Sequence, residues 1–208
     1  MKRFIKCLIV FFSYFYSYEM NLRVRLLIRL VYSFWLSRLF AQFGKNTRFG
    51  TDAVVIGGKF IRIGKGVVFG NYAEITAFAN MSERTPPSIL IDDKCQFNDF
   101  IHITACNEII IHEHVRTGKF VTITDNAHGH SNYASMSLPP NQRPIVSKGK
   151  VVIEENVWIA DKVTICSGVT IGRCSIIAAG AVVTKNIPPY SIAAGVPAKV
   201  VRQIQKDV

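Results

Sequence analysis

The chain has 208 residues and a formal net charge of +11. This length suits one domain of ordinary size with an appendage. Residues 1–48 hold nine Lys or Arg against one Glu, a net +8, and the remaining 160 residues hold 16 against 13, a net +3. The basic character therefore belongs to the N-terminal segment, which excludes a generally basic nucleic-acid-binding domain.

The N-terminal segment, residues 1–43, begins with a short apolar run. Lys2, Arg3 and Lys6 precede apolar and aromatic residues 7–18. This run is shorter than the roughly 20 residues that a membrane-spanning helix needs. It resembles the first part of a signal peptide, but no small-x-small cleavage site follows it, so secretion is not favoured.

The second half of this segment has helical periodicity. Arg25 and Arg29 lie four residues apart on one face, and Arg38 follows near the end. The apolar residues on the other face are Leu22, Leu26, Leu30, Val31, Phe34 and Trp35. A basic amphipathic helix with Phe and Trp is typical of binding to a membrane surface. Alternatively, a pair of helices caps the exposed edge of the domain that follows. Both interpretations stay open.

From Phe43 onward the apolar pattern has a period of six. It is most regular over residues 152–184, in Ile153, Ile159, Ile165, Ile171, Ile177 and Val183. An α-helix would place apolar residues at i, i+3, i+4 and i+7, and an isolated strand would alternate by two. A period of six indicates a solenoid with one short strand and one turn per repeat, with the aliphatic residues stacked inside. The sequence therefore predicts a parallel β-helix over residues 44–187, followed by a C-terminal cap over 188–208.

Two polar segments interrupt the hexads. Residues 76–88 contain a Pro-Pro pair and are predicted to form a loop. Residues 124–150 contain no hexad and are rich in Ser, Asn, Pro and Gly. Loops of this length in a compact domain are usually functional or disordered. A smaller slip falls at Gly57–Gly58.

The stretch VVIEENVWIADKVTICSGVTIGRCSIIAAGAVVTKNIPPYSIAAGVPAKVV, residues 151–201, closely resembles the C-terminal signature of hexapeptide-repeat acetyltransferases, the family of maltose and galactoside O-acetyltransferases. The resemblance covers roughly residues 44–202. It implies a left-handed β-helix with three hexads in each triangular coil. It further implies a homotrimer and acetyl-CoA as co-substrate, with no metal.

The resemblance also implies two catalytic residues. His128 aligns with the family's catalytic His, and Asn98, thirty residues earlier, aligns with an Asn that assists the transition state. The string TDNAHG resembles the TDHxHG of polysaccharide O-acetyltransferases, with Asn126 replacing the first His. Without the motif, Asn98 would be an ordinary turn residue and His128 a solvated loop residue. His130 and Asp125 are candidates to assist His128.

The remaining histidines, His102, His112 and His114, are expected to be exposed on turns of the coil. The five cysteines form no C-x-x-C pair and are an odd number: Cys7, Cys95, Cys106, Cys166 and Cys174. They are predicted to be small apolar residues in a reducing compartment.

The family's cofactor-binding positions fall in the C-terminal third. The candidates are Trp158, Ala160, Ala178, Ala179, Thr184, Lys185, Lys199 and Arg202. The resemblance implies that Trp158 lies by the active site and the pantetheine arm, and that the alanines let pantetheine approach the backbone. The Lys and Arg residues would contact the phosphates of CoA. Alone, each cation would be an ordinary surface charge, and Trp158 could instead pack on the long loop or on another subunit.

These residues suit direct acetyl transfer to a hydroxyl. An imidazole that titrates near neutral pH can accept the hydroxyl proton, and an amide can stabilise the oxyanion. No G-x-S-x-G elbow appears, so a covalent intermediate is not expected.

The expected function is O-acetylation of a sugar hydroxyl in surface-polysaccharide, O-antigen or capsule biosynthesis. The expected location is the cytoplasm, with peripheral contact at the inner face of the membrane through residues 1–40. The alternatives are an amino-sugar N-acetyltransferase, a γ-type carbonic anhydrase with three His across a trimer interface, and a non-catalytic scaffold. The acceptor itself is not readable, since loops 76–88 and 124–150 decide it.

Overall fold

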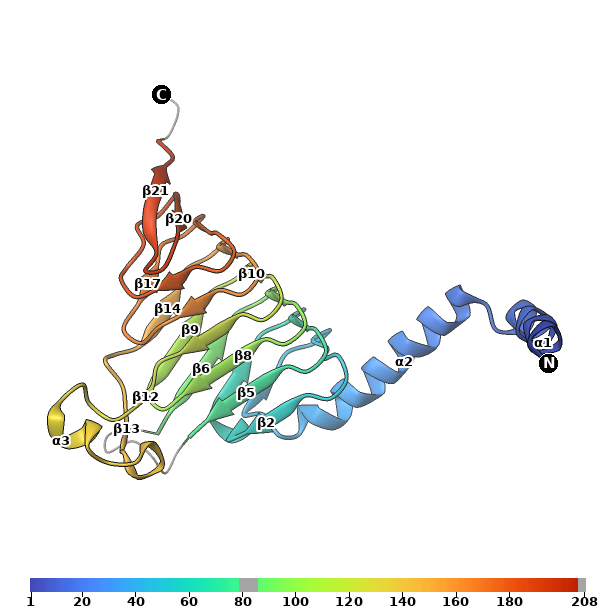
Figure 1. The fold of residues 1–208 in the computed structure, drawn as a ribbon, viewed down its shortest axis with the longest axis horizontal. Coiled ribbons are helices and arrows are strands. Elements are labelled where there is room, and N and C mark those ends of the chain that lie inside the picture. The colour runs from blue at the N-terminus through green and yellow to red at the C-terminus, as the bar shows by residue number, and fades with distance from the viewer. Residues whose placement is uncertain (79–85, 206–208) are drawn as a thin grey trace.

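In the computed structural model, which describes residues 1–78 and 86–205, each hexad forms a short strand followed by a turn. Because each strand turns a corner into the next, the chain winds into a three-sided solenoid, and its three sides are sheets of parallel strands (Figure 1). The predicted parallel β-helix is confirmed.

Sheet A contains β1 (Gln42–Phe43), β3 (Ile61–Ile63), β6 (Ser88–Ile91), β9 (Glu108–Ile111), β14 (Val151–Ile153) and β17 (Thr170–Ile171). Sheet B contains β4 (Val68–Phe69), β7 (Gln96–Phe97), β10 (Arg116–Thr117), β15 (Trp158–Ile159), β18 (Ile176–Ile177), β20 (Ser191–Ala194) and the antiparallel β21 (Lys199–Gln203). Sheet C contains β2 (Val54–Ile56), β5 (Glu74–Ala77), β8 (His102–Ala105), β11 (Thr122–Thr124), β16 (Thr164–Ile165) and β19 (Val182–Val183).

The hexad residues stack in register inside the solenoid. In sheet A, Ile153 pairs with Ile111 on one side and with Ile171 on the other. The N-terminal coils are filled by rings instead, since Phe69 stacks on Phe49 at 4.2 Å and on Phe97 at 4.9 Å between centroids. These residues are almost completely buried, so apolar burial at about 25 cal/mol per Å² holds the coils together.

We call the corners of the triangle A–B, B–C and C–A, after the sheets that they join. At each A–B turn and each B–C turn, one residue has a left-handed backbone with φ near +60°. These residues are Asn46, Asp52, Gly66, Tyr72, Lys94, Phe100, His114, Phe120, Asn156, Lys162, Cys174, Gly180 and Tyr190. A left-handed backbone costs an L-residue roughly 1–2 kcal/mol. Asn, Asp and Gly bear that cost best, so the aromatic residues at three successive B–C turns are unusual.

The breaks in the hexad pattern all fall at the C–A corner. The 3-10 turn η1 (Gly58–Phe60) follows β2 there. The loop predicted at 76–88 is shorter than expected, because Thr76 and Ala77 extend β5 and Ser88 begins β6. Most of it, residues 79–85, lies outside the described residues. The prediction that His102 lies on a turn is wrong, since it lies in β8, beside Glu74 of β5.

The long loop leaves the C–A corner between β11 and β14 (Figure 1). It contains the antiparallel pair β12 (Ala127–His128) and β13 (Ile145–Val146), the short helix α3 (Tyr133–Met136) and the turn η2 (Pro140–Gln142). Its observed bounds agree with the predicted loop at 124–150.

Two helices precede the solenoid, α1 (Lys2–Phe15) and α2 (Tyr18–Ser37). The end of α2 covers the first coil, where Ser33 accepts a hydrogen bond from the Phe49 N–H at 2.8 Å. Arg29 donates to the Asn71 side chain at 3.0 Å, so α2 lies beside the B–C corner. The C-terminal half of α2 therefore caps the solenoid, as one of the two interpretations of the sequence proposed.

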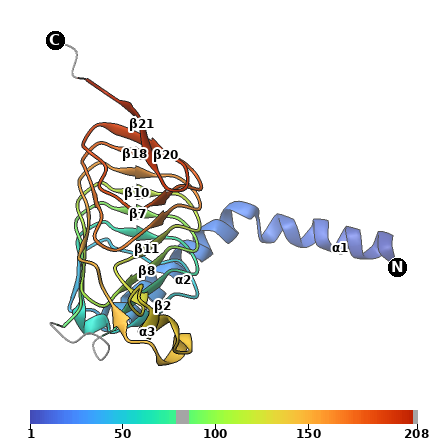
Figure 2. The same cartoon turned by 60° about the vertical axis from the view of Figure 1, so that its left-hand side comes forward.

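By contrast, α1 buries none of its residues and projects away from the solenoid (Figures 1 and 2). Among the helices of residues 1–78 and 86–205, none combines the length and the apolar content that a bilayer crossing requires.

Candidate active site and cofactor-binding surface

The B–C corner carries a column of mostly small residues, one on each successive coil. Each of them directly follows an inward-facing residue of sheet B: Asn98, Gly118, Ala160, Ala178 and Ala194. Neighbouring strands are about 4.8 Å apart, so the four steps from Asn98 to Ala194 span roughly 19 Å. We call this set the B–C column. Gly118 is buried, and the other four members of the column are exposed or half-buried at this corner of the solenoid.

A pocket of about 560 Å³ opens beside this column on the outer face of sheet B. Asn98, Arg116, Trp158, Ala160, Asp161 and Ala179 are among the residues that line it. Trp158 is 51% exposed and lies directly opposite Arg116 in the register of β15 and β10. Four of the residues singled out in the sequence therefore meet in one pocket: Asn98, Trp158, Ala160 and Ala179.

Asn98 is held by the next coil. Its side-chain Nδ2 donates to the Thr117 carbonyl at 3.1 Å, and its backbone N–H points to the Thr117 hydroxyl at 3.4 Å. A primary amide has two N–H donors. One therefore fixes the side chain, and the second is left for a bound group.

Gly118, a member of the B–C column, has no room for a side chain. A Cβ placed there would clash with the Asp161 carboxylate and with the Ala160 backbone. Asp161 accepts a hydrogen bond from the Lys119 N–H at 2.7 Å, so this carboxylate is fixed against the corner. Glycine is thus required for the close approach of two coils beside the pocket.

Two of the predicted cations lie at the far end of the same face. Lys199 pairs with Ala194, the last member of the B–C column, and Arg202 pairs with Ile192, in line with Trp158. Both side chains are exposed. Sheet B and its B–C corner therefore bring together Trp158, Ala160, Ala178, Ala179, Lys199 and Arg202.

Thr184 and Lys185 lie elsewhere. They follow β19 of sheet C, so they are at the C–A corner, and both are exposed. Within one chain the structure does not bring them to the other cofactor-binding candidates.

His128 also lies on the C–A side of the molecule. It pairs with Ile145 in the long loop, which leaves the solenoid after sheet C, and its side chain is exposed. Asn98 lies at the B–C corner, at the opposite ends of the sheet C strands. Strand β8 alone spans about 10 Å at 3.3 Å per residue, so the two corners are at least that far apart. Figure 1 shows the long loop and α2 on opposite sides of the solenoid. One chain therefore does not bring His128 to the pocket that contains Asn98.

Asp125 is a predicted partner of the His128 imidazole. The structure instead buries its carboxylate completely, where it accepts hydrogen bonds from the N–H groups of Cys106 and Asn107 at 2.8 and 2.9 Å. Asp125 anchors the base of the long loop. His130 is exposed, and its backbone N–H donates to the Ser135 hydroxyl at 3.3 Å.

Sequence reasoning missed Arg116, Gly118 and Asp161 in the pocket. Gly118 follows Thr117 as Asn98 follows Phe97, so the hexad pattern could have found it. Arg116 is 42 residues from Trp158 in the sequence, and only the pairing of β10 with β15 across the long loop makes them neighbours.

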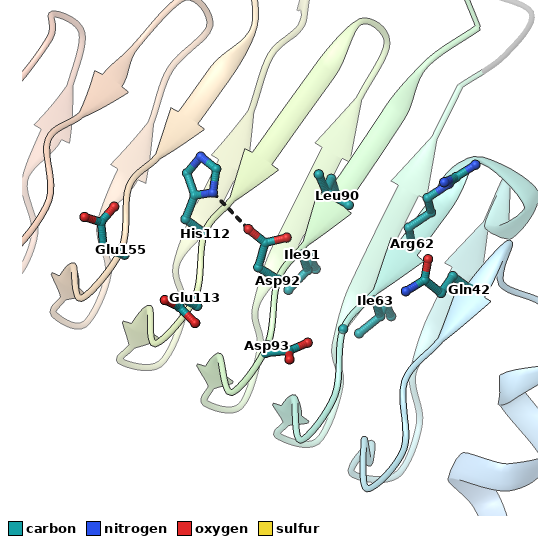
Figure 3. Close-up of a pocket in the computed structure, with 11 residues that line it drawn as sticks. Gln42, Arg62, Ile63, Leu90, Ile91, Asp92, Asp93, His112, Glu113 and Glu155 are labelled. Atoms are coloured by element: carbon teal, nitrogen blue, oxygen red, sulfur yellow. Dashed lines mark hydrogen bonds and ion pairs between the residues drawn. The ribbon is translucent and has the colours of Figure 1, made fainter.

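A second pocket of about 410 Å³ lies on sheet A (Figure 3). Four carboxylates line it, from Asp92, Asp93, Glu113 and Glu155, against Arg62 and His112. His112 contacts Asp92 at 2.9 Å. This excess of negative charge repels phosphate groups, so the pocket is a poor site for a phosphorylated cofactor.

The buried cysteines are unsuited to nucleophilic catalysis. Burial raises the pKa of the Cys95 thiol to about 12 and that of Cys106 to about 11. At neutral pH neither forms the thiolate that a covalent mechanism would need.

No three His, Cys, Asp or Glu side chains within residues 1–78 and 86–205 converge as a metal site requires. The carbonic anhydrase alternative draws its ligands from two subunits, so a single chain does not decide it.

Residues 150–185 match the family model described as bacterial transferase hexapeptide (six repeats). The chain is 31% identical over 184 residues, 86% of this chain and 89% of the relative, to the Escherichia coli K12 protein named "Putative lipopolysaccharide biosynthesis O-acetyl transferase WbbJ". The chain belongs to the hexapeptide-repeat acyltransferase family. Membership of this family supports the predicted left-handedness of the β-helix.

Two solved structures are similar in fold. One is a maltose O-acetyltransferase from Clostridium difficile 630, 25% identical, with a TM-score of 0.53 over 91% of this chain and 78% of that one. The other is a single-residue mutant of AntD, a Bacillus cereus N-acyltransferase, in complex with dTDP-4-amino-4,6-dideoxyglucose and coenzyme A. It is 18% identical, with a TM-score of 0.68 over 82% of this chain and 87% of that one.

Proposed function

We propose that the protein transfers an acetyl group from acetyl-CoA to a sugar hydroxyl during the synthesis of a surface polysaccharide. The observation that carries this proposal is the B–C column. It is a row of mostly small residues, one on each successive coil, that starts at the Asn98 pocket and ends beside Lys199 and Arg202. The similarity to the O-acetyl transferase WbbJ supports the acceptor class.

Acetyl-CoA would lie extended along this column. Its pantetheine arm would pass Ala160 and Ala178, and Trp158 would cover it from sheet B. The phosphates would lie toward Lys199 and Arg202, since guanidinium and ammonium groups form strong charge-assisted hydrogen bonds with phosphate oxygens. The thioester would then reach the pocket beside Asn98.

The chemistry needs one base and one oxyanion donor. His128 accepts the proton of the sugar hydroxyl as its oxygen attacks the thioester carbonyl. The Asn98 amide donates a hydrogen bond to the oxyanion of the tetrahedral intermediate. The C–S bond then breaks, the imidazolium returns its proton to the thiolate, and free CoA and the acetyl ester leave. No protein nucleophile takes part.

This mechanism requires more than one subunit, because His128 and Asn98 lie at different corners of the same chain. We propose the homotrimer that is typical of the family, in which the C–A corner of one subunit faces the B–C corner of the next. Thr184 and Lys185 would then approach the same cofactor from the neighbouring subunit. The site would be completed three times, once at each interface.

We further propose that α1 holds the enzyme at the inner face of the cytoplasmic membrane. Lys2, Arg3 and Lys6 give the helix a basic face, and its apolar side chains, such as Phe4 and Phe11, are exposed. Such a helix binds anionic lipid by burying its apolar face in the interface. Flotation with anionic vesicles should recover the wild-type protein, and the triple Lys2→Glu, Arg3→Glu, Lys6→Glu variant should remain unbound. Equal recovery of the two would refute this part.

The central experiment measures release of the CoA thiol from acetyl-CoA with a panel of neutral sugars, amino sugars and a polysaccharide. Release should depend on a hydroxyl acceptor and should fall by roughly 10²- to 10⁴-fold in His128→Ala, the range for loss of a general base. His130→Ala, two residues away in the same loop, is the matched control and should retain activity.

Three outcomes would count against the proposal. Turnover of amino sugars alone would assign N-acetylation, the alternative within the same reaction class. Full activity of His128→Ala would remove the base. Failure of acetyl-CoA to bind in calorimetry would remove the cofactor assignment and reopen the carbonic anhydrase and scaffold alternatives.

A further inference from the structure

Helix α2 is inverted, because its polar side faces the solenoid and its apolar side faces solvent. At 3.6 residues per turn, the side that contacts the first coils carries Arg29, Tyr32, Ser33 and Leu36. The opposite side carries apolar residues that are 38–79% exposed: Met20, Val24, Leu27, Leu30, Val31, Phe34 and Trp35. An ordinary surface helix turns its apolar stripe toward the core. We call these seven residues the outer face of α2.

The C-terminal half of α2 is fixed to the solenoid, whereas α1 is not. The Ser33 hydroxyl accepts a hydrogen bond from the Phe49 N–H at 2.8 Å, and the Tyr32 hydroxyl accepts one from the Ala53 N–H at 3.0 Å. Leu36 is buried in the hydrophobic core, and α1 buries none of its residues. A surface that binds α1 therefore only tethers the solenoid. A surface that binds the outer face of α2 also decides which end of the solenoid faces it.

The chemistry of the outer face favours anionic lipid. An exposed apolar patch of this extent marks an interaction site. Arg23 and Arg38 lie on the same side of the helix and are exposed, within a segment, residues 1–48, of net charge +8. A second copy of α2 would bring like charges together, which is unfavourable. An anionic lipid surface offers both an apolar layer for the outer face and negative charge for the arginines.

We propose that the outer face of α2 lies in the surface of an anionic lipid bilayer, so that the solenoid stands on the membrane by its N-terminal end. This goes beyond the tether proposed for α1, because it fixes the orientation of the molecule. The first coil adjoins α2, and each later coil is one strand spacing farther away (Figures 1 and 2). In sheet B, Asn98 is two spacings beyond the first coil, roughly 10 Å, and Trp158 is four, roughly 19 Å.

This orientation gives the two ends of the B–C column different surroundings. Asn98 lies toward the lipid, and Lys199 and Arg202 lie at the far end of the solenoid. Under the proposed function, on which this consequence alone rests, acetyl-CoA enters from the aqueous side and the acceptor reaches Asn98 from the membrane side. The acceptor class that fits is a saccharide still attached to a lipid.

The two tryptophans of the chain test the orientation. Trp158→Phe leaves Trp35, on the outer face of α2, as the sole indole, and Trp35→Phe leaves Trp158 on sheet B. Vesicles of phosphatidylglycerol and a phosphatidylcholine brominated on its acyl chains quench indoles that enter the apolar layer. An apolar helix face sinks about 5–10 Å into the interface, so Trp35 emission should shift to shorter wavelength and fall by roughly half or more. Trp158 should keep its emission when the same fraction of protein is bound.

A second test changes α2 and leaves α1 intact. Val31→Glu combined with Phe34→Glu removes two apolar side chains from the outer face, so partition onto anionic vesicles should fall by at least about tenfold. Val200→Glu combined with Val201→Glu is the matched control, because these residues are also apolar and exposed but lie in β21 at the far end of the solenoid. This control should bind vesicles as wild type does. If circular dichroism shows the α2 variant unfolded, the tryptophan measurement decides.

The acceptor class has its own test. The octyl glycoside of a sugar that is turned over, held in anionic vesicles, should be acetylated faster than the free sugar. The Val31→Glu, Phe34→Glu variant should abolish that difference. Equal rates in wild type would refute the lipid-linked acceptor and leave the lipid contact of α2 standing.

The proposal is overturned if vesicle-bound protein keeps unquenched Trp35 emission, which would leave α1 as the lipid contact. Quenching of Trp158 as strong as that of Trp35 would mean that the solenoid lies on its side. Equal binding to neutral phosphatidylcholine vesicles would remove the role of anionic lipid. A shift of Trp35 emission that grows with protein concentration in the absence of vesicles would assign the outer face to a second copy. The fluorescence and vesicle-binding measurements need no acetyl-CoA and no acceptor, so they do not depend on the proposed activity.

Discussion

The B–C and C–A corners of the solenoid are built from the same hexads but differ in regularity. Every step from sheet B to sheet C joins inward-facing residues six positions apart, as from Phe97 to Ile103. Steps from sheet C to sheet A vary: Ile103 to Ile111 is eight residues, and Ile123 to Ile153 is thirty. Yet the strands on both sides remain in register.

Under the proposed function, this difference lets one solenoid support two tasks. A B–C corner that contacted an extended cofactor over several coils would accept no inserted residue, because an insertion would break the B–C column. The C–A corner would have no such constraint, so loops proposed to contact the acceptor and other subunits could grow from it. Insertion at a solenoid turn is tolerated because each coil contacts only its neighbours.

The largest expected effect on activity comes from replacing Asn98, the one residue of the B–C column with a polar side chain. Asn98→Ala should lower turnover by roughly 10²- to 10³-fold, as the loss of one oxyanion donor does. The change should appear in kcat, with the KM for acetyl-CoA nearly unchanged. Asn107→Ala, in a turn at the C–A corner, is the matched control. A loss confined to the KM for acetyl-CoA would make Asn98 a binding residue instead.

At the C–A corner the main effect should be on stability. Asp125→Ala leaves the N–H groups of Cys106 and Asn107 without their buried acceptor. Hydrogen bonds to a charged group contribute about 1.5–3 kcal/mol each, so the loss of two should lower the free energy of unfolding by roughly 3–6 kcal/mol. Urea unfolding measures this directly. An unchanged midpoint, together with an altered pH profile of activity, would restore Asp125 as a partner of His128.

A matched pair of substitutions compares the corners within one coil. Ala160 follows Ile159 at the B–C corner, and Cys166 follows Ile165 at the C–A corner. Ala160→Leu should raise the KM for acetyl-CoA about tenfold, or about 1.4 kcal/mol, by filling the cofactor path. Cys166→Leu should leave this KM unchanged. Equal effects on both would mean that the cofactor does not follow the B–C column.

The smallest expected effect is a pH dependence of stability at the B–C corner. The Asn71 N–H, together with Lys119, lowers the pKa of the Asp99 carboxyl below its ordinary value of 3.8. A lowered folded-state pKa means that the stabilisation is present above pH 3.8 and is lost as the pH falls through the lower folded-state value. Asp99→Asn should therefore be slightly less stable than wild type at pH 7, by under about 1 kcal/mol, since the pair is partly exposed. The gap should close in strong acid. A gap that persists there would mean that the carboxylate charge is not the cause.

The sequence by itself determined the solenoid, its interior residues and the position of the long loop. A period of six is incompatible with a helix or an isolated strand, and residues such as Ile153 and Ile159 must therefore stack inside. Asn98 and Ala160 occupy equivalent places in the hexads, each directly after an inward-facing residue of sheet B, whereas Trp158 and Ala179 were singled out by the resemblance to the family. The predicted loop at 76–88 is too long at both ends, because Thr76 and Ser88 pair in sheets although both are polar.

Only the tertiary structure decided which residues share a corner. Residues 18 apart in the sequence share a corner only where no insertion lies between them. The insertions at the C–A corner lengthen coils by amounts that no periodicity reveals. This is why Arg116 lies beside Trp158 across 42 residues, and why His128 lies on the C–A side while Asn98, thirty residues earlier, lies at the B–C corner. The stack of Tyr72, Phe100 and Phe120 has the same origin, since these three rings meet only when three coils of unequal length stack in register.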